Sequence, residues 1–398
     1  MSEDGRQPLP TRPFLTIYVA WHPRSAQGPD LARKLYEHYR RNLYDNIAGG
    51  SGIPVIYRSD PPAGSGVPID IDLSTSETCA VVMLVDESWT GDPAWVAWAQ
   101  RVSKQTDDAG LSARLFPVAI DATAITMDIP EQAVRWDKWK DDTQDIKVRR
   151  LLTGLSYQFC RMLRFYLEHL QRPAEPEEEL IKFLKRVDIF LSHSKHDENG
   201  SDIALLIRKF LQDGGYDSFF DVFDIPIGLR FNKVLLEKVR VSAVVAIHTD
   251  SYSSREWCRR EMIEAKRSNV PLVVANCIRD LDERGFPYMA NVPIIRMDPQ
   301  ARDRIDIIVC RLMDEVLKDF LWRCWVHLVD AAAAPHTAFL PRPPELIALA
   351  SLKGRTPPIA VLVYPDPPIG AEELALFDAA APSVKLLSAT EFLAAAGT

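Results

Sequence analysis

Residues 183–328 are predicted to form a doubly wound α/β domain, which is a parallel β-sheet with helices on both faces. Short apolar or β-branched runs alternate there with segments whose apolar residues have helical spacing, as expected for strands joined by crossover helices. The run AVVAIH at 243–248 is apolar at nearly every position, as in a strand that helices cover on both sides. In such a sheet, ligands bind beyond the carboxyl ends of the strands.

The elements of this domain follow one another as strand, loop and helix. The run VDIFLS predicts the opening strand, and the adjacent Gly214 and Gly215 suit the end of the first helix. Residues 197–200 have the composition of turn and cap residues, and Ser201 is a candidate N-cap of that helix. The predicted strands are 187–192, 218–222, 243–248 and 271–276, and the predicted helices are 202–211, 231–239, 255–267 and 307–320.

A first copy of the same plan is expected over residues 10–172, as a tandem duplication. The stretch LVDESWTGDPAWVAWAQ lines up with AIHTDSYSSREWCRREM, whereas the opening strands TIYVAW and VDIFLS need a gap. The alternative is that any two α/β units share apolar strands and Trp-bearing helices. Three landmark pairs, Trp95 with Trp257, Pro130 with Pro293 and Phe159 with Phe320, are 162, 163 and 161 residues apart.

The remaining segments are assigned to linkers and to a C-terminal extension. Residues 173–182, which include most of the polar stretch RPAEPEEEL at 172–180, are expected to link the two copies. Residues 329–356 form a second predicted linker. In the extension, residues 357–398, the runs IAVLVY and VKLL flank a helical stretch at 372–377. We expect a βαβ-like unit that is too short to hold a core of its own.

The composition excludes several classes of function. A net charge of −8 over 398 residues provides no basic field for nucleic-acid phosphates, so we expect no direct nucleic-acid partner. The six cysteines are scattered without a CxxC pair, so they are read as reduced, mostly buried thiols, and no metal site is predicted. No apolar run suits a membrane span or a signal peptide, which makes a cytoplasmic protein the natural expectation.

Three stretches, VDIFLSHSKHD, FDIPIG and SREWCRREMIEA, resemble the TIR (Toll/interleukin-1 receptor) family, in particular bacterial members that cleave NAD. They correspond to the family's opening strand and loop, its BB loop, and the helix with the Trp-Cys-x-x-Glu pattern. The resemblance covers a little over a third of the chain. It implies a flavodoxin-like fold and cleavage of NAD, as a substrate and not a cofactor, to nicotinamide and ADP-ribose or a cyclised product.

The resemblance also implies roles for individual residues. Glu261 falls on the catalytic glutamate of the family. Where family members often carry Arg or an aromatic residue, this chain has His193 and Ser194, which puts stacking on nicotinamide in doubt. The implied substrate contacts are Ser192, His193, Ser194 and Lys195 in the first loop, Phe223, Ile225 and Gly228 in the BB loop (223–228), and Trp257 on the helix.

A physical argument supports Glu261 separately. Breaking the bond between nicotinamide and ribose generates positive charge on the sugar, which a fixed carboxylate can stabilise. Trp257 lies four residues before Glu261 and therefore shares its helix face, where the indole could wall the site or belong to the core. The alternative is a solvated glutamate on a charged helix, where pairs such as Arg260 with Glu264 are ordinary.

Two classes of function remain open. The first is an NAD glycohydrolase or cyclase, with a role in bacterial defence through NAD depletion or a nucleotide signal. The second is a non-catalytic TIR module that acts by self-assembly, with the BB loop as a contact surface. Self-association and an activating partner or nucleotide signal are expected for either class. A phospho-acceptor receiver is set aside, because the opening strand ends in Ser192 and His193 in place of clustered acidic residues.

Overall fold

A computed structural model gives the structure of the chain, which divides into two compact units, Thr11–Lys185 and Arg186–Thr398. Each unit is described by itself. Of the described helices, none is both long and apolar enough to cross a lipid bilayer. The structure describes residues 12–40, 51–175, 187–214, 219–220, 236–298, 300, 304–330, 333–352 and 357–396.

The second unit contains a five-stranded parallel sheet in the order β6-β5-β7-β8-β9. With strands numbered within this sheet, the order is 2-1-3-4-5, which is the flavodoxin-like arrangement. The predicted doubly wound fold is therefore confirmed. The strands are β5 (Ile189–His193), β6 (Phe219–Phe220), β7 (Ala243–His248), β8 (Leu272–Asn276) and β9 (Ile294–Arg296).

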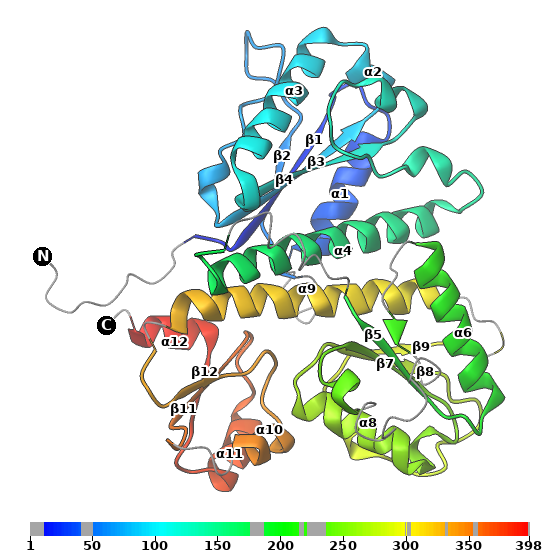
Figure 1. Ribbon diagram of the computed structural model, residues 1–398, viewed down its shortest axis with the longest axis vertical. Helices are drawn as coiled ribbons and strands as arrows, with labels where there is room; N and C mark the ends of the chain where they lie inside the picture. The colour runs from blue at the N-terminus through cyan, green and yellow to red at the C-terminus, as the bar shows by residue number, and fades with distance from the viewer. Residues whose placement is uncertain are drawn as a thin grey trace, which may run out of the picture. The chain divides into compact units, whose positions relative to one another are not determined.

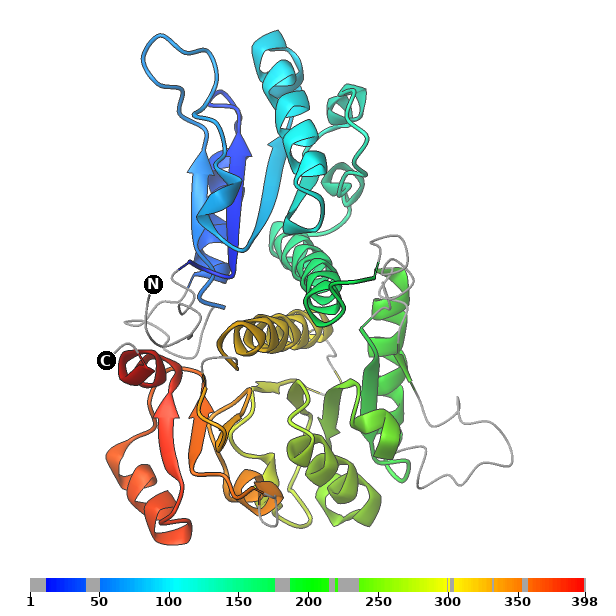
Figure 2. The same ribbon diagram turned by 60° about the vertical axis from the view of Figure 1, so that its left-hand side comes forward.

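Helices cover both faces of this sheet. Apolar residues of α8 (Glu256–Arg267), among them Met262 and Ala265, join alternate residues of the strands in one core cluster. The other face packs against α6 (Glu198–Asp213) and α9 (Ile305–Val329). Figures 1 and 2 show α8 and α9 on opposite sides of the sheet. The short helices η7 (Tyr252–Ser254) and η8 (Pro287–Met289) lie in the connections.

The start of α6 differs from the prediction. The side chain of Asp197 caps the helix by accepting a hydrogen bond from the backbone N–H of Asn199 at 3.0 Å. The helix therefore begins at Glu198, and the expected cap Ser201 lies inside its first turn. Both residue types are good N-caps, and Asp197 occupies the cap position.

The first unit has a parallel sheet in the order β2-β1-β3-β4, which matches the first four positions of the other sheet. A parallel bridge between Val118 and Val134 marks the position that β9 occupies there. These features support the predicted repeat. The elements are β1 (Leu15–Trp21), α1 (Gly28–Tyr39), β2 (Val55–Arg58), β3 (Thr78–Val85), α2 (Glu87–Thr90), α3 (Pro93–Asp108), β4 (Ala113–Ala119) and α4 (Gln144–Gln171), with η1 (Leu73–Thr75), η2 (Gly110–Ser112), η3 (Ala122–Thr126) and η4 (Trp136–Lys138).

The C-terminal extension is larger than the sequence analysis expected. Its sheet has three parallel strands, so a strand and a helix lie inside the predicted linker 329–356. Leu362, Phe377 and neighbouring residues form a small core, contrary to the expectation that this segment would have none. The elements are β10 (Thr337–Phe339), α10 (Leu346–Leu352), β11 (Val361–Tyr364), α11 (Ala371–Ala380), β12 (Lys385–Ser388) and α12 (Ala389–Ala396).

The extension packs on the end of α9, within the same unit. Trp322 and Trp325 of α9 stack with ring centroids 4.8 Å apart, and Trp325 contacts the rings of Phe339 and Phe392. Because α9 has 25 residues, one half can pack on the five-stranded sheet while the other half packs on the extension. The apolar area that the short extension cannot bury internally is buried against this helix.

Candidate active site

Glu261 lies in the second turn of α8, near the carboxyl-terminal edge of the sheet, where it contacts Ser192 at the end of β5. Its side chain is buried, with 6% of the residue exposed. One carboxylate oxygen, Oε2, accepts a hydrogen bond from Ser192 Oγ at 2.5 Å. The alternative of a solvated glutamate is therefore wrong for Glu261, which is held inside the protein by a residue of the first strand.

The bond from Ser192 is part of a longer chain of hydroxyl groups. Tyr252 is fully buried, and its hydroxyl oxygen lies 2.6 Å from Ser192 Oγ. Three elements that are separate in the sequence, β5, η7 and α8, thus converge through one residue each. Their side chains connect the sheet edge to the carboxylate.

Burial dominates the electrostatics of this carboxylate. It raises the pKa of Glu261 from an ordinary value of 4.5 to about 7, because the charged form loses its hydration. The hydrogen bond from Ser192 and the positive charge of Lys195 act in the opposite direction. A group with a pKa near neutrality can change its protonation state during a reaction at physiological pH.

The raised pKa predicts how folding stability depends on pH. The folded chain holds the Glu261 proton more tightly than the unfolded chain, so the folded state loses stability as pH rises from 4.5 to about 7. The loss over this window is of order 3 kcal/mol. We expect Glu261→Gln to be more stable than the wild type at pH 8 and equal to it near pH 4.5. Denaturant unfolding at several pH values checks this, and a pH-independent difference would contradict it.

Trp257 lies one turn before Glu261 and packs, partly buried, against the core cluster under α8. The guanidinium carbon of Arg260 lies 4.3 Å from the Trp257 ring centroid, a cation–π geometry. The expected pair between Arg260 and Glu264 is absent, because Glu264 accepts a hydrogen bond from Arg240 Nε at 2.5 Å. The outer face of α8 is thus organised by contacts that helix spacing alone does not predict.

The residues predicted to line the nucleotide site fall into three groups. Ser192 and Ser194 are each 1% exposed, and Ser194 Oγ accepts a hydrogen bond from Ser251 Oγ at 2.9 Å. His193 is half-buried and Lys195 is exposed, so both have surface available to a ligand. Phe223, Ile225 and Gly228 lie outside the residues that the structure describes.

A second polar cluster follows β7 and was missed by the sequence analysis. His248 Nε2 lies 3.0 Å from Ser253 Oγ and 3.1 Å from Asp282 Oδ2. Because both partners contact the same ring nitrogen, this is not the arrangement of a Ser-His-Asp triad, in which they contact opposite nitrogens. Burial lowers the pKa of His248, against the effect of Asp282. The position of His248 as the last residue of β7, the strand next to β5, is the signal that could have found it.

Cys258 is the nearest thiol to Glu261 along the helix, and it is 3% exposed. Burial, together with the charge of Glu261, raises the pKa of Cys258 to about 12. A thiol in this state is almost entirely protonated at neutral pH and is a poor nucleophile. The structure agrees with the expectation of a buried structural thiol.

In the first unit, apolar residues stand at the position that corresponds to Glu261. The last residues of β3 and β7, Val85 and His248, are 163 positions apart, as are the first residues of α3 and α8. This offset places Trp98 opposite Glu261, and the offset of 162 from the sequence places Ala99 there. Both residues are fully buried in an apolar core. The first copy therefore has no carboxylate at this position.

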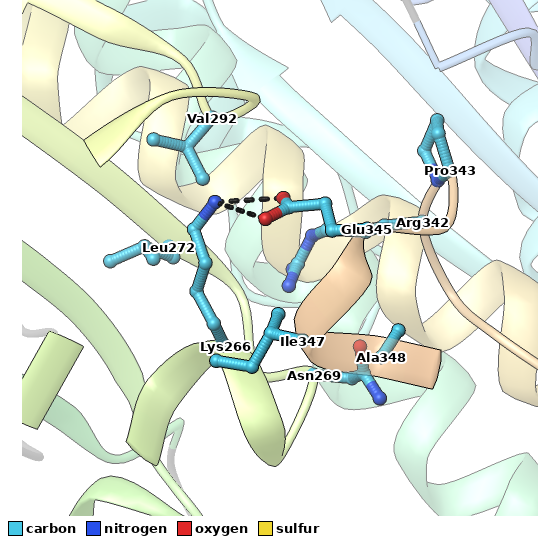
Figure 3. A pocket seen from close by; sticks show the side chains of 9 residues that line it. All are labelled: Lys266, Asn269, Leu272, Val292, Arg342, Pro343, Glu345, Ile347 and Ala348. Carbon is cyan, nitrogen blue, oxygen red and sulfur yellow. Dashed lines mark hydrogen bonds and ion pairs between the residues drawn. The ribbon is translucent and has the colours of Figure 1, made fainter. Parts of the chain in front are cut away.

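A separate pocket lies where α10 meets the end of α8 (Figure 3). Lys266 Nζ donates to both carboxylate oxygens of Glu345, at 2.7 and 2.9 Å, and also to the backbone oxygen of Ala290. Arg342 donates to the backbone oxygen of Val270. The pocket is lined by Lys266, Asn269, Leu272, Val292, Arg342, Pro343, Glu345, Ile347 and Ala348. Lys266 and Glu345 pair with each other, and Arg342 donates to the backbone, so the pocket is a structural junction.

Comparison with known proteins assigns the central segment. The family model described as "TIR domain" matches residues 189–309, which contain β5 to β9, α8 and Glu261. No curated protein matches the chain. Two solved structures are similar at 14% identity: the glycotransferase of kitacinnamycin, with a TM-score of 0.20 over 79% of this chain and 96% of that one, and tagatose-6-phosphate ketose/aldose isomerase from Escherichia coli, with a TM-score of 0.19 over 84% and 88%. Scores this low carry no argument about fold or function.

Proposed function

This chain is a TIR domain protein, and from that premise we propose that it cleaves the bond between nicotinamide and ribose in NAD, with Glu261 as the catalytic carboxylate. The observation that supports this most is a carboxylate buried at the carboxyl-terminal edge of a doubly wound sheet, where such folds bind ligands. Its raised pKa and its fixed orientation are typical of functional groups.

The reaction requires a carboxylate at the point where positive charge develops. As the C–N bond breaks, its electron pair leaves with nicotinamide, and the ribose carbon becomes an oxocarbenium-like centre. Ionised Glu261 stabilises this centre, and the surrounding low dielectric strengthens the interaction. Water then adds to the ribose carbon and loses a proton, which gives ADP-ribose. Attack by the adenine ring of the same molecule gives a cyclised product instead.

The alternative is a TIR module that acts only by self-assembly. TIR domains include both enzymes and scaffolds, so the family alone does not decide. The cost of burying Glu261 favours the enzyme, because a scaffold gains nothing from a buried carboxyl group whose charged form is penalised. An apolar side chain at this position, as in the first unit, would fill the same space without that cost.

The proposal is tested by incubating the purified chain with NAD and identifying the products by mass. We expect free nicotinamide with ADP-ribose or its cyclised form. We further propose that the rate of NAD cleavage depends on self-association through the TIR domain. An activating partner or a nucleotide signal would favour the associated state. Specific activity should then rise with protein concentration. A monomer with constant specific activity would contradict the assembly requirement but not the chemistry.

We assign no catalysis to the first unit, whose role would be packing or recognition. It carries Trp98 and Ala99 where the second unit carries Glu261, and neither side chain supplies the negative charge that the proposed mechanism requires at this position. The isolated residues 1–175 should release no nicotinamide from NAD, as measured in the same assay. Release by this fragment at a rate near that of the full chain would contradict the division of labour.

A further inference from the structure

We propose that Tyr252 is a positioning residue for Glu261 and acts through Ser192. The Tyr252 hydroxyl donates a hydrogen bond to Ser192 Oγ, which turns the Ser192 hydroxyl proton toward Glu261 Oε2. This inference rests on the proposed function of Glu261, because Tyr252 positions a catalytic group only if Glu261 takes part in catalysis.

The direction of the relay follows from counting protons. Ser192 has one hydroxyl proton and donates it to Glu261 Oε2 at 2.5 Å. The contact of 2.6 Å between Ser192 Oγ and the Tyr252 hydroxyl must then use the tyrosine proton. The alternative acceptor for that proton is the backbone oxygen of Cys258, at 3.5 Å, which is the outer limit for a hydrogen bond.

The relay fixes one oxygen of the carboxylate. Tyr252, Ser192 and Glu261 are 0%, 1% and 6% exposed, so water cannot readily replace any link. The hydrogen bond from Ser192 is made to Oε2 and not to the second oxygen, Oε1. A hydroxyl that accepts one hydrogen bond becomes a stronger donor in the next. Removing the tyrosine hydroxyl should therefore weaken the bond from Ser192 and free its rotation.

The groups around Glu261 come from three elements. Lys195, after β5, is exposed and lowers the pKa of Glu261 through its positive charge. Cys258, on α8, is protonated, and the ring of His248 packs on Tyr252 with centroids 5.8 Å apart. Burial raises the pKa of Tyr252 well above 10, so its hydroxyl remains a donor throughout the assay range.

The test compares Tyr252→Phe and Ser192→Ala with the control Tyr288→Phe, which removes a hydroxyl from a part-exposed tyrosine on η8. Each variant is made with and without Glu261→Gln in the full chain. For each pair, the difference in the free energy of unfolding is measured as a function of pH. The pH dependence of this difference reports the titration of Glu261 and requires no NAD. We expect the pH at which Glu261 titrates to rise by roughly 0.5 to 1 pH unit in Tyr252→Phe and by more in Ser192→Ala. It should not change in the control.

Activity provides the second readout. As pH falls, kcat/KM for NAD should decrease when Glu261 becomes protonated, and this decrease should begin at a higher pH in Tyr252→Phe and at a still higher pH in Ser192→Ala. At pH 6 the shift corresponds to a roughly 3- to 10-fold loss of kcat/KM for Tyr252→Phe. Unchanged titration of Glu261 in Tyr252→Phe would overturn the relay, whatever the activity and whatever Ser192→Ala shows. A shifted titration in a chain that cleaves no NAD would leave the relay standing and reject the proposed function, so the two failures are distinguishable.

Discussion

Glu261→Gln is expected to lower NAD turnover by at least about 100-fold while the fold remains intact, which is the lower end for loss of a positioned acid or base group. The amide keeps the shape of the side chain and can still accept from Ser192, but it has no charge to offer the developing cation. The measurement is the rate of nicotinamide release at pH 8, where wild-type Glu261 is mostly ionised.

A matched control is available on the same helix. Glu256, in the first turn of α8, is exposed, so Glu256→Gln removes the same charge without touching the relay. Turnover of the control should stay within about twofold of the wild type, since exposed substitutions away from a site have small effects. Near-normal turnover of a correctly folded Glu261→Gln would remove Glu261 from the mechanism.

The second large effect concerns the junction between α8 and the C-terminal extension. Lys266 is 7% exposed and pairs with Glu345, yet burial still lowers the pKa of Lys266. Removing the partner leaves an uncompensated buried charge. Glu345→Ala should therefore destabilise this unit by about 3 kcal/mol, the lower end for breaking a buried ion pair. We choose the lower end because the Glu345 side chain is 22% exposed.

Hydrogen exchange of the α8 and α10 amides, read together with denaturant unfolding, measures this loss locally. Glu373→Ala, on the exposed side of α11, is the control and should change stability by less than about 0.5 kcal/mol. Replacing both partners, with Lys266→Met and Glu345→Leu together, should recover most of the loss. A double variant as unstable as the single one would show that packing, and not charge, accounts for the effect.

The elements with a regular sequence pattern were predicted closely from the sequence. The strand at 243–248 agrees with β7 at both ends, and the helix predicted at 255–267 differs from α8 by one residue. Their patterns are long and regular, so the periodicity decides them. The three-residue strands β9 and β10 were missed, because so short a run has no measurable period. Their pairing with β8 and β11 is set by tertiary contacts.

The site was only partly accessible to sequence reasoning. Glu261 and Ser192 were both singled out, but the bond between them joins residues 69 positions apart. Tyr252 was missed, since its contact with Ser192 spans 60 positions and no local spacing encodes it. The burial of Glu261 could not be predicted from the sequence either. By composition α8 is a charged helix, and only the packing shows that Glu261 faces inward. The pKa of the carboxyl follows from that packing.

The central claim is that an ionised, buried Glu261 cleaves NAD, and the pH dependence of kcat/KM tests it most directly. This parameter reports the ionisation of the free enzyme. For the wild-type chain it should rise with pH and reach half of its maximum near pH 7, where the pKa of Glu261 lies. In Glu261→Gln the remaining activity should have no such limb. Nicotinamide release that is flat from pH 5 to 9, or equal in the two proteins, would contradict the account.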